Sequence, residues 1–264
     1  MLKEEEGMGR VVFLTSNPGG SYKEEGRRVA CELDNRNQFV DKLKNIWKSG
    51  AKCLLISSNP AAIEVNDGMR SILREAFEMS GLPAASMEVW DDRKREEMGE
   101  KVCNFDVLIL AGGHVPTQNH FFREIGLKGR IAGYEGIVIG ISAGTMNSAE
   151  VVYAAPEEEG ESVDENYQRF LPGLGLTEVM ILPHFQMLKD CMLDGKSVLE
   201  DIIYPDSAGK TFCALPDGSY IMIRDDENGG KPQVYGESYW ICDGACTQIC
   251  SDGESREWEM ARGE

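Results

Sequence analysis

The chain has 264 residues, enough for one large α/β domain or two small ones, and folding at this length buries roughly three quarters of the unfolded surface. Its 45 acidic residues outnumber its 27 basic residues, and the net charge of −18 disfavours binding to nucleic acid or to an anionic membrane surface. No apolar stretch approaches the roughly 20 residues of a membrane span and the amino end has no apolar signal core, so we expect a cytoplasmic protein.

Short β-rich runs alternate with amphipathic helical stretches along most of the chain. Helices are expected at about 37–48 and 67–80, where apolar residues recur on one stripe at helical spacing. Strands are expected at 11–14, 53–56, 86–90, 107–110, 137–141, 179–182 and 211–215. This alternation predicts an α/β fold, with a mostly parallel sheet and helices on both of its faces.

The C-terminal part of the chain has a different pattern. The segment 154–166 is acidic and poor in apolar residues, so we expect a solvated, mobile loop. Short β-rich runs then alternate with Asn-Gly-Gly and Asp-Gly turns, which predicts a C-terminal β-hairpin appendage over 219–250. No repeat or linker divides the chain, and residues 1–264 are expected to form a single α/β domain.

Ser142 follows one of the predicted strands, within Gly-Ile-Ser-Ala-Gly at 140–144. In open α/β sheets, ligands bind outside the carboxyl ends of the strands. The small residues that flank this serine permit a tight strand-turn-helix connection, which exposes its hydroxyl above the sheet. The motif predicts a nucleophile; the alternative is a close-packed glycine-rich turn with an N-capping serine.

A serine hydroxyl needs a base to take its proton. Of the three histidines, His184 ends a predicted strand as Ser142 does, and it is the predicted base. Asp217 follows the strand expected at 211–215 and is the predicted acid, which would orient the imidazole. Its Pro-Asp-Gly setting is also ordinary β-turn chemistry. Four other acids compete for this role: Glu157, Asp164, Asp194 and Glu200.

Hydrolysis also needs backbone N–H groups where negative charge develops on the substrate oxygen. The strand expected at 107–110 ends in a glycine pair, which lets the backbone approach a substrate closely. The N–H groups of Gly113 and Ala143 are the candidate oxyanion hole. Residues after the glycine pair are candidates for substrate binding: His114, Gln118 and Asn119.

The order of these residues separates fold families, because an α/β-hydrolase carries its histidine after the acid. Five segments are informative: Ala-Gly-Gly at 111–113, Gly-Ile-Ser-Ala-Gly at 140–144, Pro-Gly-Leu-Gly-Leu at 172–176, Pro-His-Phe at 183–185 and Leu-Pro-Asp-Gly-Ser at 215–219. On these segments, the chain resembles the peptidase E (aspartyl dipeptidase) and cyanophycinase family of serine peptidases.

This resemblance implies a class I glutamine amidotransferase-like fold, a flavodoxin-like three-layer sandwich. It implies hydrolysis of small peptides, as by an Asp-X dipeptidase, through an acyl-enzyme on Ser142 with His184 as base. Asp217 stands where the family usually has Glu. We expect a monomer or homodimer that acts on a small peptide. An aspartyl preference would need a cation beside the substrate carboxylate, for which the candidates are Arg123, Arg169 and Lys189.

Other classes of function have less support. Cys242, Cys246 and Cys250 lack the C-x-x-C spacing of structural zinc sites, and no nucleotide-binding motif occurs, so neither a metal nor a cofactor is predicted. A glutamine amidotransferase would use a cysteine nucleophile and commonly His-x-Glu, whereas Gln186 stands in the second position after His184. Two alternatives stay open: a non-catalytic relative that binds a small ligand at the same edge, and a cyanophycinase-like isopeptidase or amidase.

Overall fold

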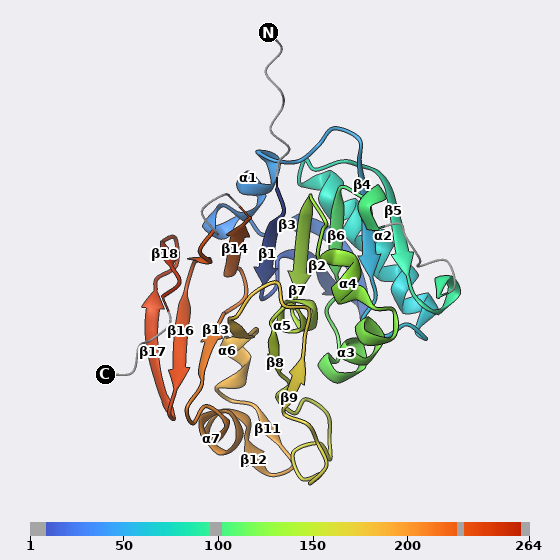
Figure 1. Cartoon of the computed structure of the whole chain (residues 1–264). Coiled ribbons are helices and arrows are strands. Elements are labelled where there is room, and N and C mark those ends of the chain that lie inside the picture. Colours follow the sequence, from blue (N-terminus) through green and yellow to red (C-terminus); the bar gives the residue numbers. More distant parts are fainter. Residues whose placement is uncertain (1–8, 96–101, 226–229, 260–264) are drawn as a thin grey trace.

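The computed structural model describes residues 9–95, 102–225 and 230–259. Its main sheet has eight strands, in the order β18 (Ser255–Glu257), β15 (Gln233–Tyr235), β14 (Tyr220–Arg224), β1 (Val11–Thr15), β7 (Ile137–Ile141), β6 (Val107–Leu110), β4 (Ala51–Ile56) and β5 (Ala84–Trp90). The five strands from β1 to β5 in this order are parallel, and the other three are antiparallel (Figure 1). The predicted α/β fold with a mostly parallel sheet is confirmed.

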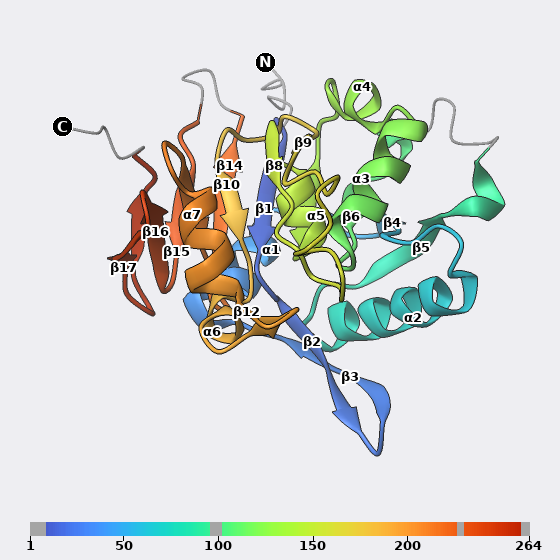
Figure 2. The ribbon, with the colours of Figure 1, turned by 90° about the horizontal axis from the view of Figure 1, so that it is seen from below.

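Helices cover both faces of this sheet (Figure 2). The neighbours Leu108 and Ile109 on β6 point to opposite faces, because side chains alternate along a strand. Leu108 packs with α3 (Val115–Glu124) and α4 (Leu127–Ile131), whereas Ile109 packs with α1 (Phe39–Lys44) and α2 (Ile63–Met79). Burial on both faces explains why the central strands have continuous apolar sequences.

Two helix boundaries differ from the sequence-based expectation. Helix α1 begins only at Phe39, because Asn37 and Gln38 have positive φ angles of 59° and 64° that a continuous right-handed helix excludes. Helix α2 begins at Ile63, four residues before the expected start, and it has no side-chain cap at its first turn.

Two of the predicted strands belong to a second sheet, of four strands, in the order β10 (Met180–Leu182), β13 (Thr211–Ala214), β16 (Ser238–Cys242) and β17 (Ala245–Cys250). Strands β10 and β13 are parallel, and β16 pairs antiparallel with β13. Apolar residues from both sheets, among them Leu14 and Cys213, pack in one cluster. The two sheets therefore share a core.

The C-terminal region 219–250 is not a single appendage. Strands β16 and β17 form the expected hairpin, which turns at Asp243 and Gly244. Strands β14 and β15, by contrast, extend the main sheet, where β14 pairs with β1. The four residues Tyr220 to Ile223 of β14 are all buried, as an internal strand requires.

A β-hairpin that the sequence analysis does not predict follows β1. Its strands are β2 (Gly19–Glu24) and β3 (Arg27–Leu33), and it projects away from the rest of the molecule (Figure 2). The turn residues Glu25 and Gly26 have φ angles of 46° and 80°. Two positive φ angles are typical of the type I′ turn that joins twisted strands.

The remaining elements are short. They are 3₁₀ turns at Arg36–Gln38, Asp92–Lys94 and Val102–Asn104, α5 (Ala143–Asn147), β8 (Val151–Tyr153), β9 (Phe170–Pro172), α6 (Phe185–Leu188), β11 (Met192–Leu193), β12 (Lys196–Ser197), a π-helix at Val198–Ile203 and α7 (Tyr204–Asp206). In the described part of the chain, every helix is too short or too polar to cross a membrane.

The acidic segment 154–166, between β8 and β9, was expected to be mobile but is held by hydrogen bonds. The carboxylate of Glu161 accepts the backbone N–H groups of Glu157 and Glu158. The carboxylate of Asp194 accepts the N–H of Gly160 at 2.9 Å. These bonds tie the segment to itself and to the β11–β12 turn.

Candidate active site

Ser142 lies in the turn between β7 and α5, with φ 49° and ψ −109°. Positive φ is uncommon for a residue other than glycine and marks a strained turn. The flanking glycines are required by packing. A Cβ atom on Gly140 would lie 2.9 Å from the Cα of Thr145, and one on Gly144 would lie 2.2 Å from the carbonyl oxygen of Leu110. Close packing of this turn against the sheet therefore holds the serine in its half-buried position at the end of β7.

The three residues predicted to act together form a hydrogen-bonded chain. The Oγ of Ser142 lies 2.9 Å from Nε2 of His184, and Nδ1 of His184 lies 2.7 Å from Oδ1 of Asp217. An ionised carboxylate can only accept, so Nδ1 carries the proton and Nε2 is free to accept from the serine hydroxyl. This is the tautomer that a general base requires.

The members of this chain come from both sheets. Ser142 follows β7 of the main sheet, whereas His184 follows β10 of the second sheet. Asp217 lies where the chain passes from β13 in the second sheet to β14 in the main sheet. His184 has left-handed backbone angles, φ 57° and ψ 34°. The hydrogen-bonded chain therefore depends on the way the two sheets pack together.

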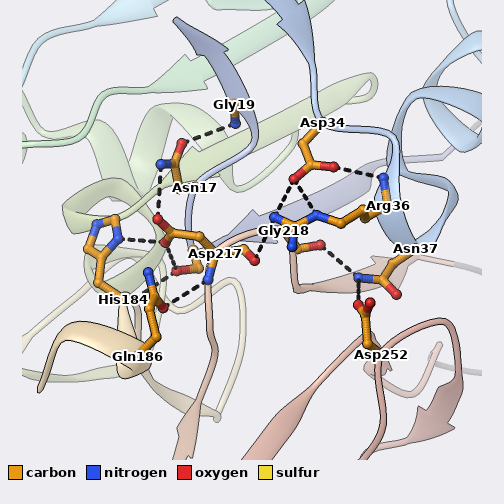
Figure 3. Close-up of polar contacts among 11 residues, drawn as sticks. Asn17, Gly19, Asp34, Arg36, Asn37, His184, Gln186, Asp217, Gly218 and Asp252 are labelled. Atoms are coloured by element: carbon orange, nitrogen blue, oxygen red, sulfur yellow. Dashed lines mark hydrogen bonds and ion pairs between the residues drawn. The ribbon is translucent and has the colours of Figure 1, made fainter. Parts of the chain in front are cut away.

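Polar groups that follow β1 surround the carboxylate of Asp217. Its Oδ1 accepts the hydroxyl of Ser16 at 2.9 Å, and its Oδ2 accepts the side-chain amide of Asn17 at 3.1 Å (Figure 3). The Ser16 hydroxyl also accepts the backbone N–H of His184 at 2.8 Å. Partial burial opposes ionisation of Asp217, but the hydrogen bonds from His184, Ser16 and Asn17 outweigh it and lower its pKa. The carboxylate is therefore ionised near neutral pH.

The turn that carries Asp217 is held by residues between β3 and α1. The guanidinium of Arg36 donates to the backbone carbonyl of Asp217 at 3.2 Å and pairs with Asp34 at 2.6 Å. The side-chain amide of Asn37 donates to the carbonyl of Gly218 at 3.0 Å (Figure 3). These contacts fix the turn that presents the carboxylate to the imidazole.

The competing acids do not contact the imidazole: among the described residues, no hydrogen bond joins Glu157, Asp164, Asp194 or Glu200 to His184. Glu157 is nevertheless unusual. Its side chain reaches solvent, yet the surrounding protein reduces the hydration of its carboxylate and raises its pKa to about 7. The attraction of His114 opposes this rise, and the negative charge of Glu161 adds to it.

The glycine pair after β6 lies beside the nucleophile. A Cβ atom on Gly112 would lie 3.5 Å from the Cβ of Ser142, and one on Gly113 would lie 2.2 Å from the Oγ of Ser58. In the part of the chain that the structure describes, the N–H groups of Gly113 and Ala143 have no hydrogen-bond acceptor. Gly113 also lines the cavity described below, and the two amides stay the candidate oxyanion hole.

The three residues predicted to bind substrate all make hydrogen bonds within the protein, and their role toward a substrate stays a prediction. His114 bonds to Thr117 at 2.7 Å and to Glu161 at 2.9 Å. Gln118 and Asn119 are 0% and 3% exposed. Their amides bond to the carbonyl of Ala111, to Asn147 of α5 and to the carbonyl of Pro172. These positions lie on the buried face of α3, so the two amides hold α3 against its neighbours.

A cavity of about 660 Å³ opens at Ser142 and His184. The hairpin β2–β3 forms one of its walls and helix α2 another. Its lining contains two basic residues, Lys23 and Arg28, which the sequence did not single out.

The three cations that were candidates for binding a substrate carboxylate do not line this cavity. Arg123 is exposed on α3, Arg169 pairs with Asp206 at 2.7 Å, and Lys189 lies 4.8 Å above the ring of Phe185.

Two signals in the sequence could have identified the missed residues. Ser16 and Asn17 directly follow the first strand, at the edge where ligands bind. The Glu-Gly pair at 25–26 separates two polar runs of similar length, as in a hairpin with a two-residue turn.

One group among the described residues has the composition of a metal site, namely His114, Glu158 and Glu161, whose ligand atoms lie within 4.8 Å of one another. His114 and Glu161 already bond to each other. The three cysteines of β16 and β17 are not among the residues grouped in this way.

Comparison with known proteins agrees with the geometry. The sequence pattern of peptidase family S51 matches residues 30–229. A peptidase from an acI-B1 actinobacterium has a similar structure, with a TM-score of 0.61 at 17% identity over 95% of this chain and 98% of that chain. A putative peptidase E protein from Listeria monocytogenes EGD-e has a TM-score of 0.54 at 17% identity, over 92% of this chain and 100% of that chain.

At such low identity, these two structures show the fold. No curated protein matches the sequence. The family pattern, by contrast, covers more than half of the chain and includes Ser142, His184 and Asp217. The resemblance predicted from the sequence is therefore confirmed: this chain is a peptidase that belongs to family S51, the peptidase E family.

Proposed function

We propose that this protein hydrolyses short peptides through an acyl-enzyme on Ser142, with His184 as general base and Asp217 as the acid of a Ser-His-Asp triad. The observation that carries the proposal is the continuous hydrogen-bonded chain from the serine hydroxyl to the aspartate carboxylate. Family membership supports the same reaction class.

The chemistry follows from the roles of these groups. The Oγ of Ser142 attacks the carbonyl carbon of the scissile bond while its proton passes to Nε2 of His184. The ionised Asp217 stabilises the imidazolium, and the N–H groups of Gly113 and Ala143 bind the oxyanion. His184 then donates its proton to the leaving amine, and a water molecule hydrolyses the acyl-enzyme by the same steps in reverse order.

The size of the cavity favours small substrates, because about 660 Å³ falls within the roughly 300–1,000 Å³ of sites for small molecules. An Asp-X dipeptide is the substrate that the family resemblance implies. Asp-X dipeptides therefore belong in the first panel of substrates, beside neutral dipeptides and acyl-arylamides.

The decisive variant is Ser142→Ala, which removes the nucleophile. We expect hydrolysis to fall about 10⁵- to 10⁶-fold. A fluorophosphonate probe should label the wild-type protein at Ser142 and leave the variant unlabelled, because only an activated serine reacts. Ser71→Ala, at an exposed serine on α2, is the matched control and should retain both properties. Turnover that survives in Ser142→Ala would overturn the mechanism, and a wild-type protein that resists the probe would favour a ligand-binding role.

A further inference from the structure

The β2–β3 hairpin carries two unneutralised positive charges into the cavity. Lys23 and Arg28 are direct partners in the register of the hairpin, so their side chains share one face, and both residues line the cavity. Like charges directly opposite each other destabilise a strand pair. Arg28 donates to the hydroxyl of Ser21 at 3.3 Å, but among the described residues no carboxylate pairs with either cation. In a chain with 45 acidic residues, this arrangement favours an anionic ligand.

A second wall of the cavity, formed by α2, is apolar. Five residues of α2 line the cavity: Gly68 and four with apolar side chains, whose spacing of i, i+4, i+7 and i+8 places them on one stripe of the helix, namely Val65, Met69, Ile72 and Leu73. Val65, at the outer end of this stripe, is 65% exposed. The cavity therefore combines a surface for an apolar side chain with a surface for an anion. Figure 2 shows the hairpin and α2 side by side.

The base of the hairpin lies at the hydrogen-bonded chain, and the cations lie farther out. The backbone N–H of Gly19 donates to the side chain of Asn17, which in turn donates to Asp217. Lys23 follows Gly19 by four residues, which places it ~13 Å along the strand at ~3.3 Å per residue. An extended peptide covers that length with roughly four residues. The two cations are therefore placed for a group several residues away from the scissile bond.

We propose that the β2–β3 hairpin and α2 form an extended substrate subsite. In this subsite, the α2 stripe binds an apolar side chain of the peptide, and Lys23 with Arg28 binds a carboxylate several residues from the bond that is cleaved. The proposal rests on the proposed peptidase function and names its substrate class: acidic peptides longer than a dipeptide. The carboxylate is either the C-terminal group of the peptide or an acidic side chain, and both would make the same charge-assisted hydrogen bonds.

The test compares matched tetrapeptides that contain one leucine. In the first pair, one peptide ends in a free carboxylate and the other in an amide. In the second pair, both peptides are amidated at the C-terminus, and one has Asp as its last residue where the other has Asn. In the double variant Lys23→Gln/Arg28→Gln, KM for the peptides with a carboxylate should rise about 10- to 100-fold, because bonds to charged groups are lost. The amidated neutral peptides should keep their KM. For every substrate kcat should stay within about twofold, since binding energy that is lost equally from the substrate and the transition state alters only KM.

Arg27→Gln is the matched control, because Arg27 is an exposed cation on the other face of the same hairpin and does not line the cavity. It should behave as wild type. The effect of the double variant should also shrink at high salt, since salt screens exposed charges. The two peptide pairs distinguish a C-terminal carboxylate from an acidic side chain.

Binding of the same tetrapeptides to the Ser142→Ala variant separates this proposal from the proposed function. Calorimetry on that variant should give a Kd for the acidic peptides that rises about 10-fold or more when Lys23 and Arg28 are also replaced. The subsite would be overturned if the Kd were the same with and without the two cations, or if Arg27→Gln raised the Kd equally. Either result would leave the hydrolytic mechanism intact. Residual hydrolysis in Ser142→Ala would overturn the mechanism while leaving the binding result valid.

Discussion

The turn that carries Ser142 and the β2–β3 hairpin face the same cavity, but the sequence specifies them in different ways. Around Ser142, the backbone is packed so tightly that a Cβ atom on Gly144 would lie 2.2 Å from a carbonyl oxygen. At the hairpin turn, a Cβ atom on Gly26 would have no neighbour within 4 Å. Lys23 and Arg28 are exposed to solvent.

The two regions therefore differ in role: one positions the reacting atoms, and the other, as we propose, recognises the substrate. Positions of the reacting atoms depend on backbone contacts in the core, where few substitutions fit. Substrate preference, as we propose it, depends on charged side chains of an exposed hairpin, where most substitutions fit. Loops and hairpins on a rigid scaffold can therefore change specificity without disturbing the catalytic geometry.

After loss of the nucleophile itself, the largest effect is expected from Asp217→Asn, which keeps the shape of the side chain. An amide can favour the wrong tautomer of His184, and kcat should fall about 10³- to 10⁴-fold. KM should change little, because the cavity wall formed by the hairpin is untouched. Steady-state kinetics on any cleaved peptide measures both values. The comparison tests whether the turn that carries Asp217 and the hairpin act separately.

Asp164→Asn is the control for this variant, because Asp164 is exposed and its carboxylate accepts from the backbone N–H of Asn166. It should retain wild-type activity. A large loss in Asp164→Asn together with a small loss in Asp217→Asn would move the acid to the segment 154–166 and contradict the geometry described above.

A smaller effect, on stability, should distinguish the two regions directly. Gly144→Ala forces a Cβ atom against the carbonyl of Leu110, and such overpacking should cost roughly 3 kcal/mol of unfolding free energy. Gly26→Ala meets no atom but must adopt φ 80°, which should cost only about 1 kcal/mol. Urea unfolding measures both. Similar losses in the two variants would remove the contrast between a packed turn and an open one.

The sequence predicted the catalytic candidates because each of them follows a continuous apolar run. The limits expected for β6 and β7 agree with the structure, since strands buried on both faces are recognisable as such runs. The sheet to which each strand belongs could not be predicted in this way. An apolar run such as that of β13 does not specify its partner, and its pairing with β10 and β16 depends on contacts distant in sequence.

The hairpin and the two cations that it carries were not predicted, and this has a physical reason. The exposed strands β2 and β3 have no clear apolar alternation, and hydrophobic periodicity is the main signal of a strand. Gln118 and Asn119 were selected because a polar residue near a glycine pair resembles a ligand contact. In the structure, their amides satisfy buried carbonyl and amide groups, as buried polar side chains must.

The smallest effect concerns Glu157, in the segment 154–166, whose pKa is raised from 4.5 to about 7 by loss of hydration and by neighbouring acids. Between these two values the folded state binds more protons than the unfolded state, so this group lowers stability as the pH rises. Glu157→Gln removes the cost of ionisation. The variant should match wild type near pH 4 and exceed its unfolding free energy above pH 7 by about 1 kcal/mol or less, because water screens the exposed carboxylate.

Glu24→Gln makes the same change of charge on the exposed hairpin and serves as the control. Urea unfolding at pH 4, 6 and 8 should show a gain that grows with pH for Glu157→Gln and a smaller one for Glu24→Gln. Equal gains in both variants would mean that relief of the net charge of −18, and not the surroundings of Glu157, causes the effect. A larger gain for Glu157→Gln would show that the surroundings of Glu157 disfavour a negative charge, whereas the exposed hairpin does not.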